Sequence, residues 1–331
     1  MSGPNVAITW FGGHYIEDMT LEVGNLIAFM TYAMQILISF MMLSAIFIMV
    51  PRAQASADRI NEVLDEKIGI HDPENPKTVS FAGKNATLAF NHVNYRYHGA
   101  EKLALEDIDF QAKSGEIVAI IGGTGSGKTT LVNLIPRLYD IESGSIQING
   151  TDISDMTQYN LRELMGFVPQ KAVLFSGTIR DNMQYGKPDA TDEMIWKALE
   201  IAQAKDFVSE MEDGLDSHVE QGGGNFSGGQ RQRLAIARAL VKTADIYVFD
   251  DSFSALDFKT DANLRQALKT NMKESITVLV AQRVSTVMDA DMILVLDEGK
   301  LVGKGTHEEL LATNETYQEI VHSQLREEDL A

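Results

Sequence analysis

Residues 122–129 read Gly122-Gly123-Thr124-Gly125-Ser126-Gly127-Lys128-Thr129, and this stretch decides the fold. It follows an apolar run, Ile117–Ile121, and precedes a segment with helical spacing, Thr130–Leu138. A strand, a glycine-rich loop and a helix in this order are the context of a phosphate-binding P-loop. The glycines allow backbone N–H groups to converge on phosphate oxygens at a helix N-terminus. We therefore expect residues 122–130 to bind ATP, with Lys128 at the β- and γ-phosphates and the Thr129 hydroxyl on Mg²⁺.

A second apolar run, Ile246–Phe249, ends in the carboxylate of Asp250. This pattern predicts a buried strand that delivers Asp250 to the metal of the P-loop site. Many core strands end in Asp, so this run indicates a nucleotide site only in combination with the P-loop. Together the two features predict a P-loop NTPase.

A third feature, Asn225-Phe226-Ser227-Gly228-Gly229-Gln230, lies between them and introduces a predicted helix, Arg231–Val241. Ser227 is a natural N-cap residue, and the two glycines permit a close approach of the backbone to an anion. By itself a Ser-Gly-Gly sequence is more often a loop than a binding site.

Strand-like and helix-like segments alternate through the second part of the chain, which indicates a parallel sheet covered on both faces. We predict a hairpin turn at Glu298-Gly299 and helical structure from residue 160 to the run that ends at Asp250. Short β-rich runs occur at Thr87–Tyr97, Ile108–Gln111, Ile117–Ile121, Ser145–Ile148, Ile246–Phe249, Thr277–Ala281 and Met292–Leu296.

Composition narrows the classes of partner. The net charge of −19 repels phosphate backbones, which argues against nucleic acid as the main partner. The chain has no cysteine, which excludes disulfides, thiol catalysis and cysteine-based zinc sites.

Leu26–Val50 carries no formal charge and spans roughly 37 Å as a helix, enough to cross a bilayer. Acidic residues precede it, whereas Arg52 and Arg59 follow it closely. The positive-inside rule therefore places everything after Pro51 in the cytoplasm, next to a cell membrane and its lipid.

The chain divides at residues 67, 86 and 325 by composition and periodicity. Residues 1–67 are predicted to hold the spanning helix (about 26–50) and its cytoplasmic extension (51–67), followed by a linker, 68–86. Residues 326–331 form an acidic tail. The start of the chain is either an amphipathic segment or the tail of an earlier membrane helix in a longer protein, and we favour the second.

Residues 87–325 resemble the nucleotide-binding domain of an ABC transporter, and residues 20–66 resemble the last helix and connector of an exporter-type half-transporter. The resemblance implies an α/β P-loop NTPase with an antiparallel β-subdomain near 87–115 and a helical subdomain near 172–235. It also implies that Phe226–Gln230 is the signature motif, which normally begins with Leu.

The resemblance assigns further residues to the ATP site. By this resemblance, Gln170 is the glutamine that touches Mg²⁺ and communicates with the membrane domain. Tyr97 becomes the ring that stacks on adenine, although an ordinary strand tyrosine remains the alternative. Ser254–Asp257 becomes a loop at the dimer interface, and Glu220 the counterpart of a glutamate that faces the membrane domain.

Two residues depart from the family pattern. The residue after the strand aspartate is usually Glu, which positions or activates the attacking water, whereas here it is Asp251. The shorter side chain withdraws the carboxylate by about 1.5 Å, and a misplacement of about 1 Å can cost on the order of 10²-fold in rate. Gln282 stands where the family usually has His and cannot change its protonation state near neutral pH.

These departures favour a site that binds ATP and hydrolyses it slowly. In this family two domains enclose two ATP molecules, each held by the P-loop of one domain and the signature of the other. Our hypothesis is the degenerate half of a heterodimeric exporter in a bacterial membrane, with a second half-transporter as partner. The transported substrate is not encoded in these residues. Alternatives are a homodimer in which Asp251 still serves, a soluble ABC protein of DNA repair or translation, and a regulatory ATP-binding module.

Overall fold

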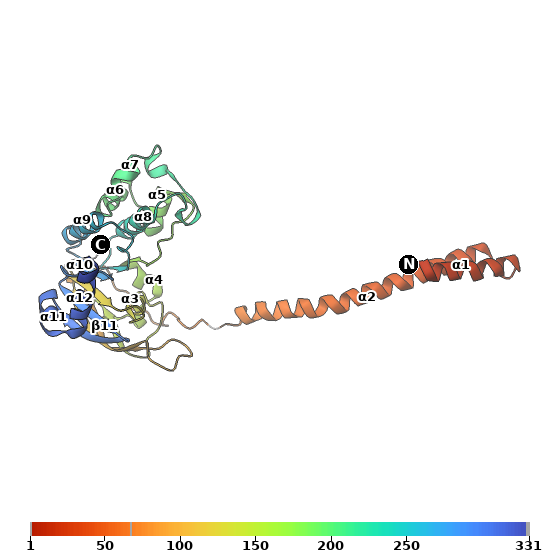
Figure 1. The fold of residues 1–331 in the computed structure, drawn as a ribbon, viewed down its shortest axis with the longest axis horizontal. Coiled ribbons are helices and arrows are strands. Elements are labelled where there is room, and N and C mark those ends of the chain that lie inside the picture. Colours follow the sequence, from red (N-terminus) through yellow and green to blue (C-terminus); the bar gives the residue numbers. More distant parts are fainter. Residues whose placement is uncertain (1, 67, 329–331) are drawn as a thin grey trace. The chain divides into compact units, whose positions relative to one another are not determined.

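The computed structural model describes residues 2–66 and 68–328, which form two compact units that divide between Gly69 and Ile70 (Figure 1). The first unit is a pair of helices, and the second is an α/β domain.

The first unit consists of α1 (Ser2–Glu17) and α2 (Val23–Leu64). In the described part of the chain, α2 is the one helix long and apolar enough to cross a membrane. It continues without a break through Pro51, so the predicted span and its predicted extension are a single helix.

The helix α1 runs antiparallel to the first part of α2. Thr9 and Asn5 place their polar side chains against the sulfur atoms of Met30 and Met34, one turn apart on α2. Gly12 gives the closest approach, because a Cβ atom there would lie 2.2 Å from the side chain of Leu26. The small residue therefore allows the two helices to pack.

The second unit is built on one mixed sheet of order β5-β4-β1-β2-β12-β11-β3-β10-β9-β6. Its parallel part confirms the expected α/β core, although β12 pairs antiparallel with β11. The strands of this part are β3 (Ile117–Gly122), β6 (Met165–Val168), β9 (Ile246–Asp250), β10 (Ile276–Val280), β11 (Met292–Asp297) and β12 (Lys300–Gly305).

The antiparallel part comprises β1 (Thr87–Tyr95), β2 (Leu105–Lys113), β4 (Ser143–Ile148) and β5 (Thr151–Asp152). It therefore extends beyond the predicted range of 87–115. The hairpin between β11 and β12 turns at Glu298 and Gly299, both with positive φ, as the sequence predicts.

Alternate residues of the central strands face two hydrophobic cores, one on each side of the sheet. On β9, Tyr247 and Phe249 belong to one core, whereas Ile246 and Val248 belong to the other. A strand buried on both faces must be apolar throughout, which explains the uninterrupted hydrophobic runs in the sequence.

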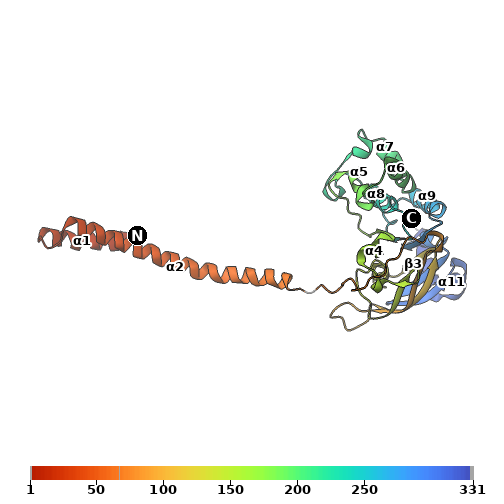
Figure 2. The ribbon, with the colours of Figure 1, turned by 180° about the vertical axis from the view of Figure 1, so that it is seen from behind.

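The helices cover both faces of the sheet. Four of them gather on one side of the domain, away from α11 (Figure 2), and form the expected helical subdomain: α5 (Ile179–Gly186), α6 (Asp192–Ile201), α7 (Lys205–Ser209) and α8 (Gly228–Leu240). The remaining helices are α3 (Lys128–Leu134), α4 (Gln158–Glu163), α9 (Phe258–Asn271), α10 (Val284–Val287), α11 (His307–Thr313) and α12 (Glu315–Glu328).

Three predicted elements differ from the structure. The strand β6 lies in a region predicted to be helical. The helix α3 ends at Leu134 rather than Leu138, because Pro136 cannot continue it. The helix α12 enters the predicted acidic tail and reaches Glu328, whereas residues 329–331 lie outside the described residues.

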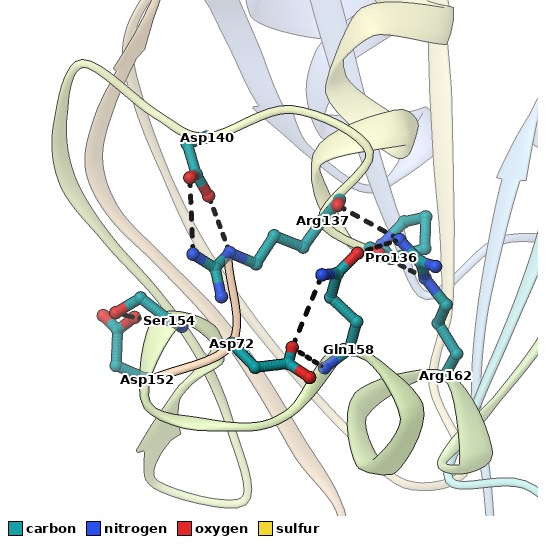
Figure 3. Close-up of polar contacts among 8 residues, drawn as sticks. All are labelled: Asp72, Pro136, Arg137, Asp140, Asp152, Ser154, Gln158 and Arg162. Atoms are coloured by element: carbon teal, nitrogen blue, oxygen red, sulfur yellow. Dashed lines mark hydrogen bonds and ion pairs between the residues drawn. The ribbon is translucent and has the colours of Figure 1, made fainter. Parts of the chain in front are cut away.

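The segment predicted as a linker is attached to the α/β domain from Asp72 onward. Asp72 accepts a hydrogen bond of 2.8 Å from the backbone N–H of Gln158, at the start of α4 (Figure 3). Arg162, one turn further along α4, donates to the carbonyl oxygen of Pro136. The loop after α3 is held in turn by the pair of Arg137 and Asp140, 2.6 Å apart.

Asp245 also binds this segment. Its carboxylate is fully buried and accepts hydrogen bonds from the backbone N–H groups of Ala82 and Gly83 and from the side-chain amide of Asn149, at 2.7–3.0 Å. A buried carboxylate with several donors joins the segment to the base of β9.

We predict that Asp245→Ala destabilises the domain by about 2–4 kcal/mol, because it takes the acceptor away from one buried donor, the N–H of Gly83, and two half-buried ones, the N–H of Ala82 and the amide of Asn149. The matched control is Asp155→Ala, which removes an exposed ion pair to Lys77 and costs at most about 1 kcal/mol. Unfolding of the detergent-solubilised chain is followed by the fluorescence of Trp196 in a Trp10→Phe background. Equal stability of the two variants would contradict the prediction.

Candidate ATP site

The P-loop connects β3, which ends at Gly122, to α3, which begins at Lys128. Gly125 and Gly127 have φ angles of 82° and 102°, a region that favours glycine. At Gly122 an added Cβ atom would lie 2.1 Å from the carbonyl oxygen of Leu296 on the neighbouring strand. The loop therefore needs glycine at these positions to hold its backbone in a tight turn.

Lys128 is the cation of this loop. Its Nζ donates to the carbonyl oxygens of Gly122 and Gly123 at 2.8 and 2.7 Å. Burial lowers the pKa of Lys128 below its ordinary value, while the nearby carboxylates of Asp251 and Asp250 act in the opposite direction. An ammonium group held by carbonyls at a glycine-rich turn is suited to bind phosphate oxygens.

Thr129 and Asp250 lie together, as the sequence predicts. The Thr129 hydroxyl donates a hydrogen bond of 3.1 Å to the carboxylate of Asp250, at the end of β9. Burial raises the pKa of Asp250, and the hydrogen bond from Thr129 opposes that rise.

The residues of this site fit Mg²⁺ rather than a metal with many protein ligands. Among residues 2–66 and 68–328, no group of three or more His, Asp or Glu side chains could hold a metal ion. Mg²⁺ is usually bound by one or two carboxylates together with substrate phosphates and water. A hydroxyl and a carboxylate beside a phosphate loop satisfy that requirement.

Asp251, Gln282 and Gln170 lie together, and Asp251 contacts both glutamines. Asp251 Oδ2 accepts from Gln282 Nε2 at 2.7 Å and from Gln170 Nε2 at 3.3 Å. They follow the parallel strands β9, β10 and β6, whose carboxyl ends share one edge of the sheet. Burial raises the pKa of Asp251, and the hydrogen bonds from the two amides oppose the rise.

The predicted signature motif forms the N-terminus of α8. Ser227 caps the helix by accepting from the backbone N–H of Gln230, whose side chain accepts from the N–H of Ser227. Ser227 and Gly228 are exposed, whereas the side chain of Phe226 is buried and packs near Phe207. The aromatic residue thus anchors the turn and leaves the capped helix end exposed.

Tyr97 lies beside the P-loop helix. Its hydroxyl shares a hydrogen bond of 2.8 Å with the hydroxyl of Thr130, and its ring meets Tyr95 and Tyr139 edge-on. Tyr139, which no sequence motif predicts to be part of the site, is 37 % exposed and lies in the loop after α3. The one sequence feature that could have indicated Tyr139 is its place as an aromatic residue just beyond the end of the P-loop helix.

Comparisons with known proteins agree with this geometry. Residues 105–254 match the protein family described as ABC transporter. The chain is 44% identical over 327 residues to an uncharacterized ABC transporter ATP-binding protein of Mycobacterium tuberculosis, covering 98% of this chain and 56% of that protein. It is 39% identical over 317 residues to an ATP-dependent lipid A-core flippase of Desulfotalea psychrophila, covering 96% and 55%.

A solved structure of a bacterial Atm1-family ABC exporter with ATP bound superposes with a TM-score of 0.76 at 34% identity. The superposition covers 92% of this chain and 53% of that one. The chain therefore spans about half the length of the relatives that it matches.

The fold and the P-loop define the second unit as a P-loop NTPase. More closely, it is an ABC ATPase domain with a mixed sheet and a helical subdomain, preceded by an apolar helix and similar to the domains of exporters.

We predict that Gly122→Ala abolishes ATP binding, because the added methyl group collides with the backbone of β11 and displaces the loop. Gly123→Ala is the control, since a Cβ atom there meets nothing within 4 Å. Binding is measured with a fluorescent ATP analogue. Retention of affinity by Gly122→Ala would contradict the interpretation that the loop geometry forms the site.

Proposed function

We propose that this chain is the ATP-binding subunit of an ABC exporter, in which closure of two nucleotide-binding domains on ATP drives a substrate across the membrane. The observation that carries the proposal is that one chain joins a complete P-loop site to a long apolar helix. The names of the relatives, a flippase and an exporter, support it.

The residues of the P-loop site have separate tasks in this function. Lys128 and the loop N–H groups bind and orient the phosphates, and Thr129, Asp250 and Gln170 would hold Mg²⁺. When bound, Mg²⁺ neutralises charge on the phosphates during in-line transfer. Tyr97 offers its ring to adenine at the edge of the loop.

Hydrolysis at this site is proposed to be slow. Asp251 is one methylene shorter than Glu, and its Oδ2 atom already accepts two amide hydrogen bonds. The shorter side chain withdraws the carboxylate from the attacking water, and a misplacement of about 1 Å can cost on the order of 10²-fold in rate. Gln282 stands where the family usually has His. It donates one of the two amide hydrogen bonds to Asp251, the other residue that departs from the family pattern.

A second half-transporter is the proposed partner, and the assembly is a heterodimer in a bacterial cell membrane. The exposed helix end at Ser227 and Gly228 would complete the partner's ATP site. Its phosphate-binding N–H groups are at the start of a helix, where the helix dipole favours an anion. The transported substrate is not assigned.

Combining Asp251→Glu with Gln282→His should raise the steady-state ATP turnover of the full chain at least about tenfold, because it returns a carboxylate to the attacking water. ATP affinity should change little. Lys128→Ala in both backgrounds is the control and should remove phosphate binding.

Turnover by the natural sequence equal to that of the double variant would contradict the proposed slow site. That result would favour the homodimer, in which Asp251 serves as the active carboxylate.

The absence of cysteine allows a direct test of the membrane span. In intact cells, a membrane-impermeant maleimide should label a Thr20→Cys variant but not Phe40→Cys or Ser56→Cys. After lysis it should also label Ser56→Cys, because that position lies in the part of α2 after Pro51, which the positive-inside rule places in the cytoplasm. Labelling of Phe40→Cys from either side would contradict a spanning α2.

A further inference from the structure

The side chain of Gln324, on the last helix, binds the backbone that carries Gln282. Its Nε2 donates to the carbonyl oxygen of Gln282 at 2.6 Å, and its Oε1 accepts from the N–H of Val284 at 2.7 Å. One side chain therefore binds two backbone groups on either side of Arg283.

Gln324 supplies hydrogen-bond partners to two backbone groups that have none in the local secondary structure. Val284 is the first residue of α10, and the first N–H groups of a helix have no partner within the helix. Gln282 lies just after the end of β10, beyond the last paired residue of that strand. A glutamine amide presents a donor and an acceptor together, so it can bind both groups at once.

The position of Gln324 is fixed by the packing of α12. Tyr317 is fully buried and shares a hydrogen bond of 2.7 Å with His307 on α11. Ile320 and Val321 pack on the same core. Because residues three and four apart lie on one face of a helix, this packing directs Gln324 to the same side.

We propose that Gln324 is a positioning residue for the ATP site, through which the C-terminal helix sets the side chain of Gln282 against Asp251. The route has three steps: α12 holds Gln324, Gln324 holds the backbone of Gln282, and Gln282 Nε2 donates to Asp251 at 2.7 Å. The effect on catalysis rests on the proposed function of Asp251 and Gln282.

Hydrogen exchange tests the contact without any reaction. In Gln324→Met, which keeps the length of the side chain and removes both polar atoms, the amide of Val284 should exchange at least about tenfold faster. The control is Gln318→Met on the same helix, which loses only a hydrogen bond to the carbonyl of Leu311. Unchanged exchange at Val284 in Gln324→Met would overturn the positioning role.

Kinetics tests the consequence. Gln324→Met should lower kcat of the full chain about fivefold and leave KM for ATP within about twofold, because positioning acts on the reacting groups rather than on binding. In a Gln282→Ala background it should have no further effect. Equal effects with and without the Gln282 side chain would overturn the proposed route.

Two further measurements keep the outcomes distinct. The unfolding midpoint of Gln324→Met should match that of Gln318→Met, and a large loss specific to Gln324→Met would assign it a merely structural role. Gln324→Asn retains the amide on a shorter side chain that cannot reach both groups, so it should repeat the kinetic loss if Gln324→Met does not fold. Absence of ATP binding by the natural chain would overturn the proposed function, whereas the exchange result at Val284 is independent of ATP.

Discussion

The convergence of parallel strand ends at one edge of the sheet is the constraint on which the site depends. Strands β3, β9, β10 and β6 deliver the P-loop, Asp250, Asp251, Gln282 and Gln170 to that edge. The strands stay in register because alternate apolar residues fill a core on each face. Small shifts of a strand would therefore move these side chains, and the packed core prevents such shifts.

The ATP site is held from several directions. Asp245 attaches the segment before β1 to the base of β9, and Gln324 attaches α12 to the segment after β10. Both contacts use side chains to satisfy buried or terminal backbone groups, which are costly to leave unpaired. The structure thus links chain segments far from the P-loop to the positions of Asp251 and Gln282.

Much of the fold follows from local patterns. The glycines of the P-loop, the apolar run before Asp250 and the cap at Ser227 each require one local geometry, and the structure has it. The strand β6 was missed because its four residues are too few to show a period. The contacts of Asp245 and Gln324 join residues far apart in sequence, so no local sequence pattern predicts them. The contact between Asp251 and Gln282 likewise required the register of β9 beside β10.

We propose that this site holds ATP and hydrolyses it slowly. The most direct measurement is single-turnover chemistry with γ-labelled ATP, using an excess of the full chain so that every nucleotide is bound. We predict that the bound nucleotide remains ATP for minutes and is released unchanged. Release of labelled phosphate on the order of once per second would contradict the claim, because that rate belongs to a competent phosphoryl-transfer site.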